Sequence, residues 1–201
     1  FMNQEKVWDK IAPRWNEIKN HPSSAVKNFL KGKKGKVLDL GSGSGRNFPS
    51  IPKNMEIYAT DFSKEMLKFA EQKAKKLKLN LKTSHTTSKK IPFEDNYFDH
   101  AICIAVLHCI PTKKARKEAM KEILRTLKPN AKALISVWSR NSPRLKNRPK
   151  ETYVPWTSVG VKKRYTYIYD REELEKEIEN AGFKIINISE DKNIDATIQK
   201  I

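Results

Sequence analysis

Residues 37–45 combine an apolar run, one acid and three glycines in a spacing that suits a ligand-binding loop. Asp39 lies inside the run and precedes glycines at every second position, Gly41, Gly43 and Gly45. Glycine has no Cβ, so the chain can bend sharply there and a ligand can approach the backbone. A nicotinamide loop would read Gly-x-Gly-x-x-Gly and would hold a pyrophosphate at a helix N-terminus. Here the third glycine comes one residue early, and the acid suits a cationic ligand better than a diphosphate.

A second acid follows the next expected strand. Residues 55–61 read as a strand that ends in Asp61, from which a carboxylate can accept hydrogen bonds from both hydroxyls of a ribose. The simpler alternative is that Asp39 only caps a turn and that Asp61 only precedes a helix capped by Ser63. Two acids at two successive strand ends nevertheless predict a pocket.

This pattern resembles the S-adenosylmethionine (SAM) loop of the class I methyltransferases. In that loop the acid lies near the ammonium or sulfonium end of the ligand. The resemblance implies SAM as the cofactor, bound by Asp39, Gly41, Ser42, Gly43, Gly45, Asp61, Phe62, Thr87, Ser88 and Ile104.

Length and charge indicate one basic domain. The chain has 201 residues, enough for one well-buried α/β core, with 41 Lys and Arg against 23 Asp and Glu, a formal net charge of +18. The cations are spread along the chain rather than gathered in a tail. The positive electrostatic potential of such a surface attracts polyanions, and binding of nucleic acid is the commonest explanation for so high a net charge. The alternative is a lysine-rich, solvated surface with no such partner.

The cysteine spacing and the hydropathy of the chain indicate the cellular compartment in which we expect the protein. Cys103 and Cys109 form neither a disulfide framework nor a Cys-x-x-Cys pair, so we expect a reducing compartment and no metal site. No apolar run approaches the roughly 20 residues that span a bilayer. We therefore expect a cytoplasmic protein that does not associate with membranes.

Apolar periodicity predicts a doubly wound α/β fold with a mostly parallel, seven-stranded sheet, the Rossmann-like fold of class I methyltransferases. The expected strands are residues 37–40, 55–61, 79–84, 101–107, 131–138, 183–189 and 194–201. Helices are expected at 63–77, from about 115 to the Lys-Pro-Asn of 128–130, and at 171–181. Residues 1–31 form two short amphipathic helices that we expect to cover the cofactor cleft. Residues 139–169 interrupt the alternation as a basic, proline-containing insertion on the substrate side, within a single domain, 1–201.

Four separated segments narrow the resemblance. They are Ile11-Ala12-Pro13, the run from Ile104 to His108, Val154-Pro155-Trp156, and the run from Arg164 to Tyr169. Together they resemble the tRNA wobble-uridine methyltransferases, which esterify 5-carboxymethyluridine in the anticodon. The chain departs from that family at three places. Cys109 replaces a second histidine, Thr87-Ser88 replaces an acid that reads the adenine, and Tyr167 replaces a histidine.

The resemblance implies methyl transfer to a carboxylate in tRNA. The predicted catalytic residues are those that could orient this carboxylate: the cations Arg14 and Arg164 and the donors His108 and Tyr165. A carboxylate is already ionised at neutral pH, so the enzyme needs no general base and its main task is to position the acceptor. A strong ion pair would favour the ground state, which makes neutral donors attractive as orienting groups. The resemblance also suggests a small, zinc-binding activator subunit that forms a heterodimer with this chain.

Clustered cations and one tryptophan are the candidates for RNA contact: Lys19, Arg140, Arg144, Lys146, Arg148, Trp156, Lys162 and Lys163. Each has a structural alternative. His108 can be a satisfied core histidine, Trp8 and Trp15 can be core residues, and the loop cations can be solvated. Two other functions stay open for the chain as a whole. One is a SAM methyltransferase of small molecules or proteins, and the other is a non-catalytic RNA-binding module on the same fold.

Overall fold

The structure is a computed structural model that describes residues 3–156 and 162–201. Its helices are α1 (Gln4–Ile18), α2 (Ser24–Leu30), α3 (Lys64–Leu77), α4 (Lys113–Thr126) and α5 (Arg171–Asn180). Its strands are β1 (Gly35–Leu40), β2 (Met55–Asp61), β3 (Asn80–His85), β4 (Phe98–Ile104), β5 (Leu127–Trp138), β6 (Glu151–Trp156), β7 (Lys162–Tyr167), β8 (Phe183–Glu190) and β9 (Asn193–Lys200).

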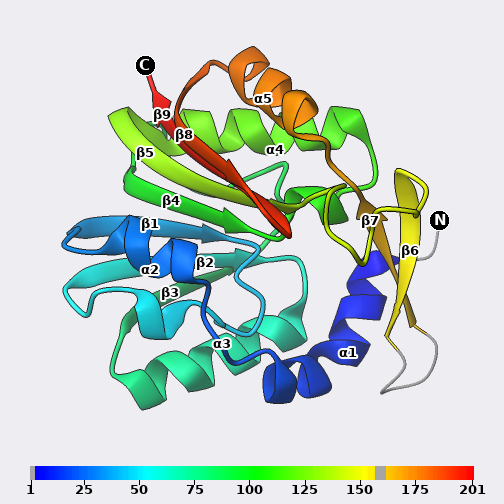
Figure 1. Ribbon diagram of the computed structural model, residues 1–201. Helices are drawn as coiled ribbons and strands as arrows, with labels where there is room; N and C mark the ends of the chain where they lie inside the picture. Colours follow the sequence, from blue (N-terminus) through cyan, green and yellow to red (C-terminus); the bar gives the residue numbers. More distant parts are fainter. Residues whose placement is uncertain (1–2, 157–161) are drawn as a thin grey trace.

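Seven of these strands form one sheet in the order β3-β2-β1-β4-β5-β9-β8 (Figure 1). β1 pairs in parallel with β2 and β4, and β4 pairs in parallel with β5. Only β9 runs antiparallel to its two neighbours. The predicted doubly wound, mostly parallel sheet is confirmed. The order reverses next to β1, and ligands of open α/β sheets bind at such a point, beyond the carboxyl ends of the strands.

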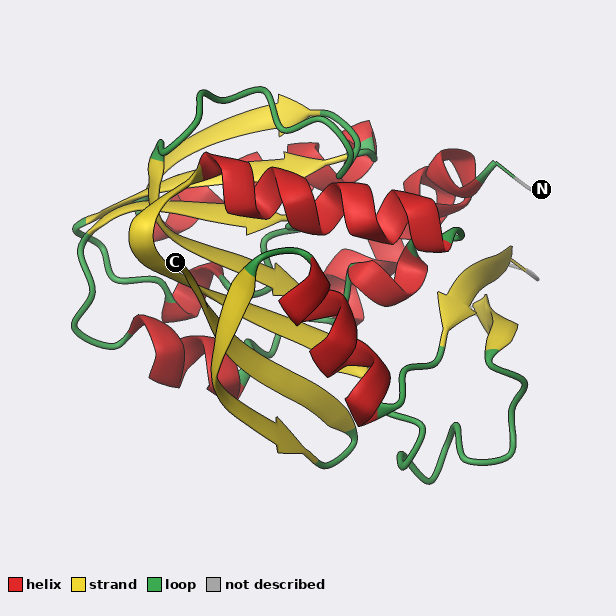
Figure 2. Cartoon of the chain, turned by 90° about the horizontal axis from the view of Figure 1, so that it is seen from above, coloured by secondary structure: helices red, strands yellow, loops and turns green. Residues whose placement is uncertain are grey.

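Both faces of the central strands are buried because helices cover both. Val37 belongs to the apolar cluster under α2 and α3, whereas the next residue, Leu38, belongs to the cluster under α4 and α5. A central parallel strand therefore reads as a continuous apolar run rather than an alternation. Figure 2 shows helices on both sides of the sheet.

Helix starts follow from local capping. The Ser63 hydroxyl accepts the backbone N–H of Met66 at 3.2 Å at the start of α3, and Thr112 accepts that of Ala115 at 3.1 Å at the start of α4. Each bond satisfies one backbone donor that the helix itself leaves unpaired. These caps fix where each helix leaves the carboxyl end of the preceding strand.

Two predicted boundaries are wrong. The fourth strand ends at Ile104 rather than at residue 107, because Ala105 takes a positive φ of 62° and residues 107–109 form a short 3-10 helix. α4 ends at Thr126, and β5 begins at Leu127, so Pro129 lies within the first part of a strand and not at a helix end.

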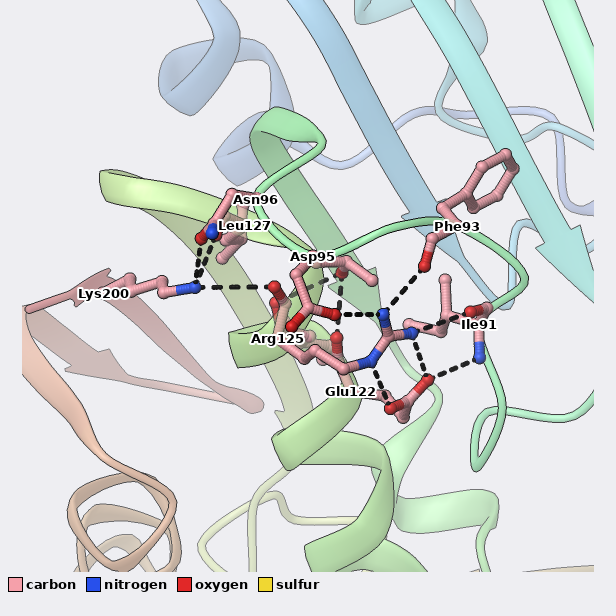
Figure 3. Close-up of polar contacts among 10 residues, drawn as sticks. Ile91, Phe93, Asp95, Asn96, Glu122, Arg125, Leu127 and Lys200 are labelled. Carbon is pink, nitrogen blue, oxygen red and sulfur yellow. Dashed lines mark hydrogen bonds and ion pairs between the residues drawn. The ribbon is translucent and has the colours of Figure 1, made fainter.

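Arg125 anchors the last turn of α4. Its guanidinium donates to the carbonyl oxygens of Phe93 at 2.8 Å and Ile91 at 2.9 Å, and it pairs with Glu122 and Asp95 (Figure 3). The side chain thus ties the last turn of α4 to the loop that leads into β4. This network lies at the start of β5, at the end of the sheet opposite to the strand ends considered below.

The insertion contains a hairpin that the sequence pattern did not predict. β6 and β7 pair antiparallel, Val154 opposite Arg164, as a separate two-stranded sheet. Figure 2 shows this hairpin standing apart from the main sheet. α1 packs beside β7 at the end toward which the parallel strands point (Figure 1). α2, by contrast, buries Val26 and Leu30 against the sheet.

Candidate active site

A cavity of about 220 Å³ opens at the carboxyl ends of the parallel strands. The glycine loop after β1, the ends of β2 and β4, the residues after β3, α1 and β7 all contribute to its walls. These six segments, far apart in the sequence, thus meet at the point where the strand order reverses. Within the described part of the chain, no helix is long and apolar enough to cross a membrane.

The glycine loop is bent tightly against the end of β4. Gly41 has a φ of +67°, and a Cβ there would lie 2.4 Å from Cγ2 of Val106. Gly43 has a φ of +54°, and its N–H donates to Oδ2 of Asp61 at 2.9 Å. Gly41 is therefore required both for its conformation and for its close approach to Val106.

The two acids of the sequence pattern lie close enough to repel each other. Burial, followed by the charge of Asp61, raises the pKa of Asp39 to about 7, while Arg46 opposes the shift. Burial raises the pKa of Asp61 to about 6, although backbone N–H groups, including those of Ser63 and Gly43, hold it down. Oδ2 of Asp39 has no hydrogen-bond partner. An uncompensated carboxylate at this depth fits a site that receives a cationic ligand.

The predicted cofactor residues lie around one cavity, with two exceptions. Gly41, Ser42, Gly43, Asp61, Phe62, Thr87, Ser88 and Ile104 line it. Asp39 is 1% exposed and lies beneath the loop, where it acts through its charge. Gly45 does not line the cavity, because the ring of Phe48 fills the space beside it, 2.6 Å from where a Cβ would lie. The buried carboxylate of Asp39, the glycine loop and the carboxylate of Asp61 on the ribose side together fit SAM.

His108 lines the same cavity as a neutral ring. Its Nδ1 accepts the backbone N–H of Trp138 at 3.2 Å, and its ring stacks on the Trp138 indole with centroids 4.6 Å apart. Burial, aided by the charges of Arg164 and Arg144, lowers the pKa of His108 to about 3. The single proton of the ring is therefore on Nε2, which is the donor that His108 offers to a ligand.

Arg164 enters the cavity from β7 and is surrounded by all four tryptophans of the chain. Its guanidinium carbon lies 5.0 to 6.0 Å from the ring centres of Trp8, Trp15, Trp138 and Trp156. We call these four residues the tryptophan cage. The side chain is 6% exposed, its Nε has no partner, and no described carboxylate pairs with it. Indole faces stabilise a guanidinium but do not neutralise it, so an anion can bind here.

Two predicted catalytic residues do not line the cavity. Arg14 lies on the outer face of α1, where its half-exposed guanidinium pairs with Glu17 at 2.6 Å. Tyr165 is buried next to Arg164 in sequence, but its hydroxyl donates to the carbonyl of Pro111 at 2.9 Å. Side chains of neighbouring residues on a strand point to opposite faces, which explains why Tyr165 cannot accompany Arg164.

Two of the predicted RNA-contact cations lie over a tryptophan ring. The guanidinium carbon of Arg144 lies 4.4 Å from the ring centre of Trp138, the residue on which His108 also stacks. Nζ of Lys19 lies 5.9 Å from the ring centre of Trp15. Arg140 turns back to the carbonyl of Arg148 at 2.5 Å, and Lys163 is exposed on the hairpin. Lys146 and Arg148 are exposed in the turns before β6, and the side chain of Lys162 lies outside the described residues.

Residues of the site that the sequence did not single out include Arg46, Trp138 and Gln4, which all line the cavity. The Gln4 amide accepts the N–H of Tyr165 at 2.9 Å and donates to the carbonyl of Lys163 at 3.4 Å. It thus holds the backbone on either side of Arg164. Only Arg46, which directly follows the glycines, carried a local signal.

This fold and site define a SAM-dependent methyltransferase, and comparisons with known proteins agree. Residues 38–135 match the model of the methyltransferase domain family. A SAM-dependent methyltransferase from Methanosarcina mazei superposes with a TM-score of 0.76 at 20% identity, covering 90% of this chain and 99% of that one. One from Aquifex aeolicus gives 0.71 at 22% identity, covering 94% and 98%. At these identities the structures show the fold alone.

Relatives detected by sequence similarity indicate a more specific family of methyltransferases. The tRNA (carboxymethyluridine(34)-5-O)-methyltransferase of Schizosaccharomyces pombe is 30% identical over 169 residues, which cover 81% of this chain and 69% of that protein. The tRNA (carboxymethyluridine(34)-5-O)-methyltransferase alkbh8 of Xenopus tropicalis is 29% identical over 77% of this chain but only 24% of its own length. The chain belongs to the tRNA (carboxymethyluridine) methyltransferase family, and its cofactor is SAM.

Proposed function

We propose that this enzyme transfers the methyl group of SAM to the carboxylate of 5-carboxymethyluridine at the wobble position of tRNA. The observation that carries the proposal is Arg164, a buried cation with no described carboxylate partner in the cavity that binds the cofactor. The printed names of the relatives support the acceptor, and the net charge of +18 supports a polyanionic substrate.

The tryptophan cage and His108 divide the work of positioning. SAM supplies a methyl group activated by a sulfonium. Arg164 draws the acceptor carboxylate into the cavity, and the Nε2–H of His108 donates to one of its oxygens so that the other faces the methyl group. Indole faces around Arg164 offer stacking surfaces to a planar uracil, which excludes water from the reacting atoms.

Esterification removes the negative charge, so a tight ion pair would hold the substrate more firmly than the transition state. The cage moderates this problem. Four indole faces already stabilise the Arg164 cation, and the second orienting donor, His108, is neutral. Release of the neutral ester is then favourable, because the product no longer attracts Arg164.

The test is methyl transfer from labelled SAM to tRNA that carries the free carboxymethyl group, followed by nucleoside mass analysis. The assay is run with and without a small zinc-binding subunit, because such an activator is part of the proposal. We expect label in an alkali-labile wobble-uridine ester. The Arg164→Met variant should lose at least about 100-fold in transfer while it keeps SAM affinity.

Arg171→Met is the matched control, since Arg171 lies on α5, lines neither cavity and pairs with Glu175 at 2.9 Å. Absence of label in both assays, with SAM binding intact in calorimetry, would assign the enzyme to a different acceptor.

A further inference from the structure

Arg46 lies between two cavities. It directly follows the glycine loop and lines the cofactor cavity together with a second, polar cavity of about 420 Å³. The second cavity is bordered by the linker between α1 and α2, by the ends of β4 and β5, and by the turn between β8 and β9. His21 and Ser23 represent the linker, and Trp138 is shared with the first cavity.

The guanidinium of Arg46 has no direct polar partner among the described residues. Among the residues that the structure describes, it takes part in no ion pair or hydrogen bond. Asp39 acts on it electrostatically but does not touch it. Two lysines are near enough to be affected by its charge: repulsion from Arg46 contributes, after burial, to the lowered pKa values of Lys19 and Lys73. An anion beside Arg46 would relieve this repulsion and satisfy the guanidinium.

The sheet topology indicates which part of the cofactor comes near Arg46. Thr87 and Ser88 follow β3, and Asp61 ends β2, so the adenosine half belongs over these two strands. The next strands in the sheet are β1 and β4. An extended cofactor that continues in this direction carries its amino-acid end over the glycine loop toward Ala105, which lines both cavities as Arg46 does.

The amino-acid end of SAM carries an ammonium and a carboxylate. Asp39 supplies negative charge for the cationic groups, but it would repel the carboxylate. A planar guanidinium can hold a carboxylate through two parallel hydrogen bonds, which a lysine cannot reproduce. We propose that Arg46 binds the carboxylate of the cofactor's amino-acid end, a role that is independent of the methyl acceptor.

The experiment compares two cofactor analogues on two proteins by calorimetry. S-adenosylhomocysteine carries the carboxylate, and its decarboxylated analogue keeps the adenosine, thioether and ammonium groups but lacks the carboxylate. Arg46→Met should weaken S-adenosylhomocysteine about 10- to 100-fold, the usual range for charge-assisted hydrogen bonds, and should change the decarboxylated analogue less than about 2-fold. Arg46→Lys should lose affinity for the carboxylate ligand only, and to a smaller extent.

Equal loss for both analogues would overturn the proposal and make Arg46 a structural residue. Unchanged binding of both analogues, with weaker binding of tRNA, would also overturn it and assign Arg46 to an RNA phosphate. Should Arg46→Met fail to fold by circular dichroism, Arg46→Lys provides the same comparison. Arg171→Met should bind both analogues as the unchanged protein does. Because no acceptor is present, failure here leaves the proposed methyl acceptor unaffected.

Discussion

The backbone N–H of Trp138 donates to Nδ1 of His108, and the two rings stack with an interplanar angle of 27°. One residue thus sets both the tautomer and the orientation of the other. His108 follows β4 and Trp138 ends β5, so the parallel pairing of these two strands is what aligns them. The imidazole is fixed as a neutral donor before any substrate binds.

His108→Ala should lower kcat about 10- to 100-fold, since it removes a donor to the reacting carboxylate, and should leave SAM affinity unchanged. It should also destabilise the fold by about 1–3 kcal/mol, because the Trp138 N–H loses its acceptor. His108→Asn offers an amide donor and a carbonyl acceptor and should retain more of both properties. Single-turnover rates and urea unfolding measure the two effects. Loss of SAM affinity in His108→Ala would instead assign the residue to the fold.

SAM binding should weaken as the pH falls through about 7. The pKa of Asp39 is raised to about 7 and that of Asp61 to about 6, and the ligand requires both carboxylates ionised. Protons must therefore leave before the ligand binds, so affinity falls up to about 10-fold per pH unit for each group below its pKa. Calorimetry between about pH 5.5 and 8.5 measures this, and Asp39→Asn should remove the step near 7. A pH-independent Kd in the unchanged protein would refute the requirement.

Asp39→Asn should stabilise the ligand-free protein at pH 8. The folded state holds the proton of Asp39 up to about pH 7, whereas an unfolded aspartate loses it near 3.8. Rising pH between these values therefore destabilises the fold, and the full penalty is present above 7. Asn carries no charge, so the variant should melt several degrees higher at pH 8, at about 2–4 °C per kcal/mol. At pH 5 the difference should shrink; an equal gain at both pH values would contradict the explanation.

Gly41→Ala should destabilise the protein more than Gly43→Ala. Both positions have a positive φ, a strain of roughly 1–2 kcal/mol for alanine. Only at Gly41 does the new Cβ also collide with Val106, at 2.4 Å; at Gly43 the nearest atom is 3.8 Å away. Val106→Ala should therefore rescue part of the loss in Gly41→Ala and none of it in Gly43→Ala. Urea unfolding of the two double variants tests this, and equal rescue would rule out the steric cause.

The part of the site that sequence predicted best is the part with local causes. Asp39, Gly41 and Asp61 lie within 23 residues, and each reports its own role through its residue type and its place at a strand end. The seven strands were predictable because apolar runs alternated with amphipathic helices. The ends of β4 at Ile104 and of α4 at Thr126 were missed, because the residue types gave no sign of the positive φ of Ala105 or of the extended backbone of Leu127.

The acceptor side could not be predicted in the same way. The prolines and cations of residues 139–164 obscured the β6–β7 hairpin, yet Pro155 is compatible with a strand that has only one neighbour. The tryptophan cage joins Trp8 and Trp15 of α1 with Trp138 of β5 and Trp156 of β6. Because the four residues come from three separate elements, no sequence spacing predicts the cage. Arg14 and Tyr165 were predicted from their chemistry, as a cation and a neutral donor, but their placement depends on which face of the helix or strand each occupies.

The hydrogen bond from the backbone N–H of Tyr165 to the Gln4 amide oxygen joins residues 161 positions apart. Contacts of such separation form late in folding, because a long loop must close before they contribute stability. During synthesis from the N-terminus, α1 emerges long before its partner strand β7. Trp8 and Trp15 therefore lack the hairpin that covers them until residue 167 has left the ribosome, while the glycine loop and β1, β2 and β4 are already available to pair. The nascent chain should therefore acquire its cofactor half before its acceptor half, and in that interval Trp8 and Trp15 lack the packing that the hairpin provides.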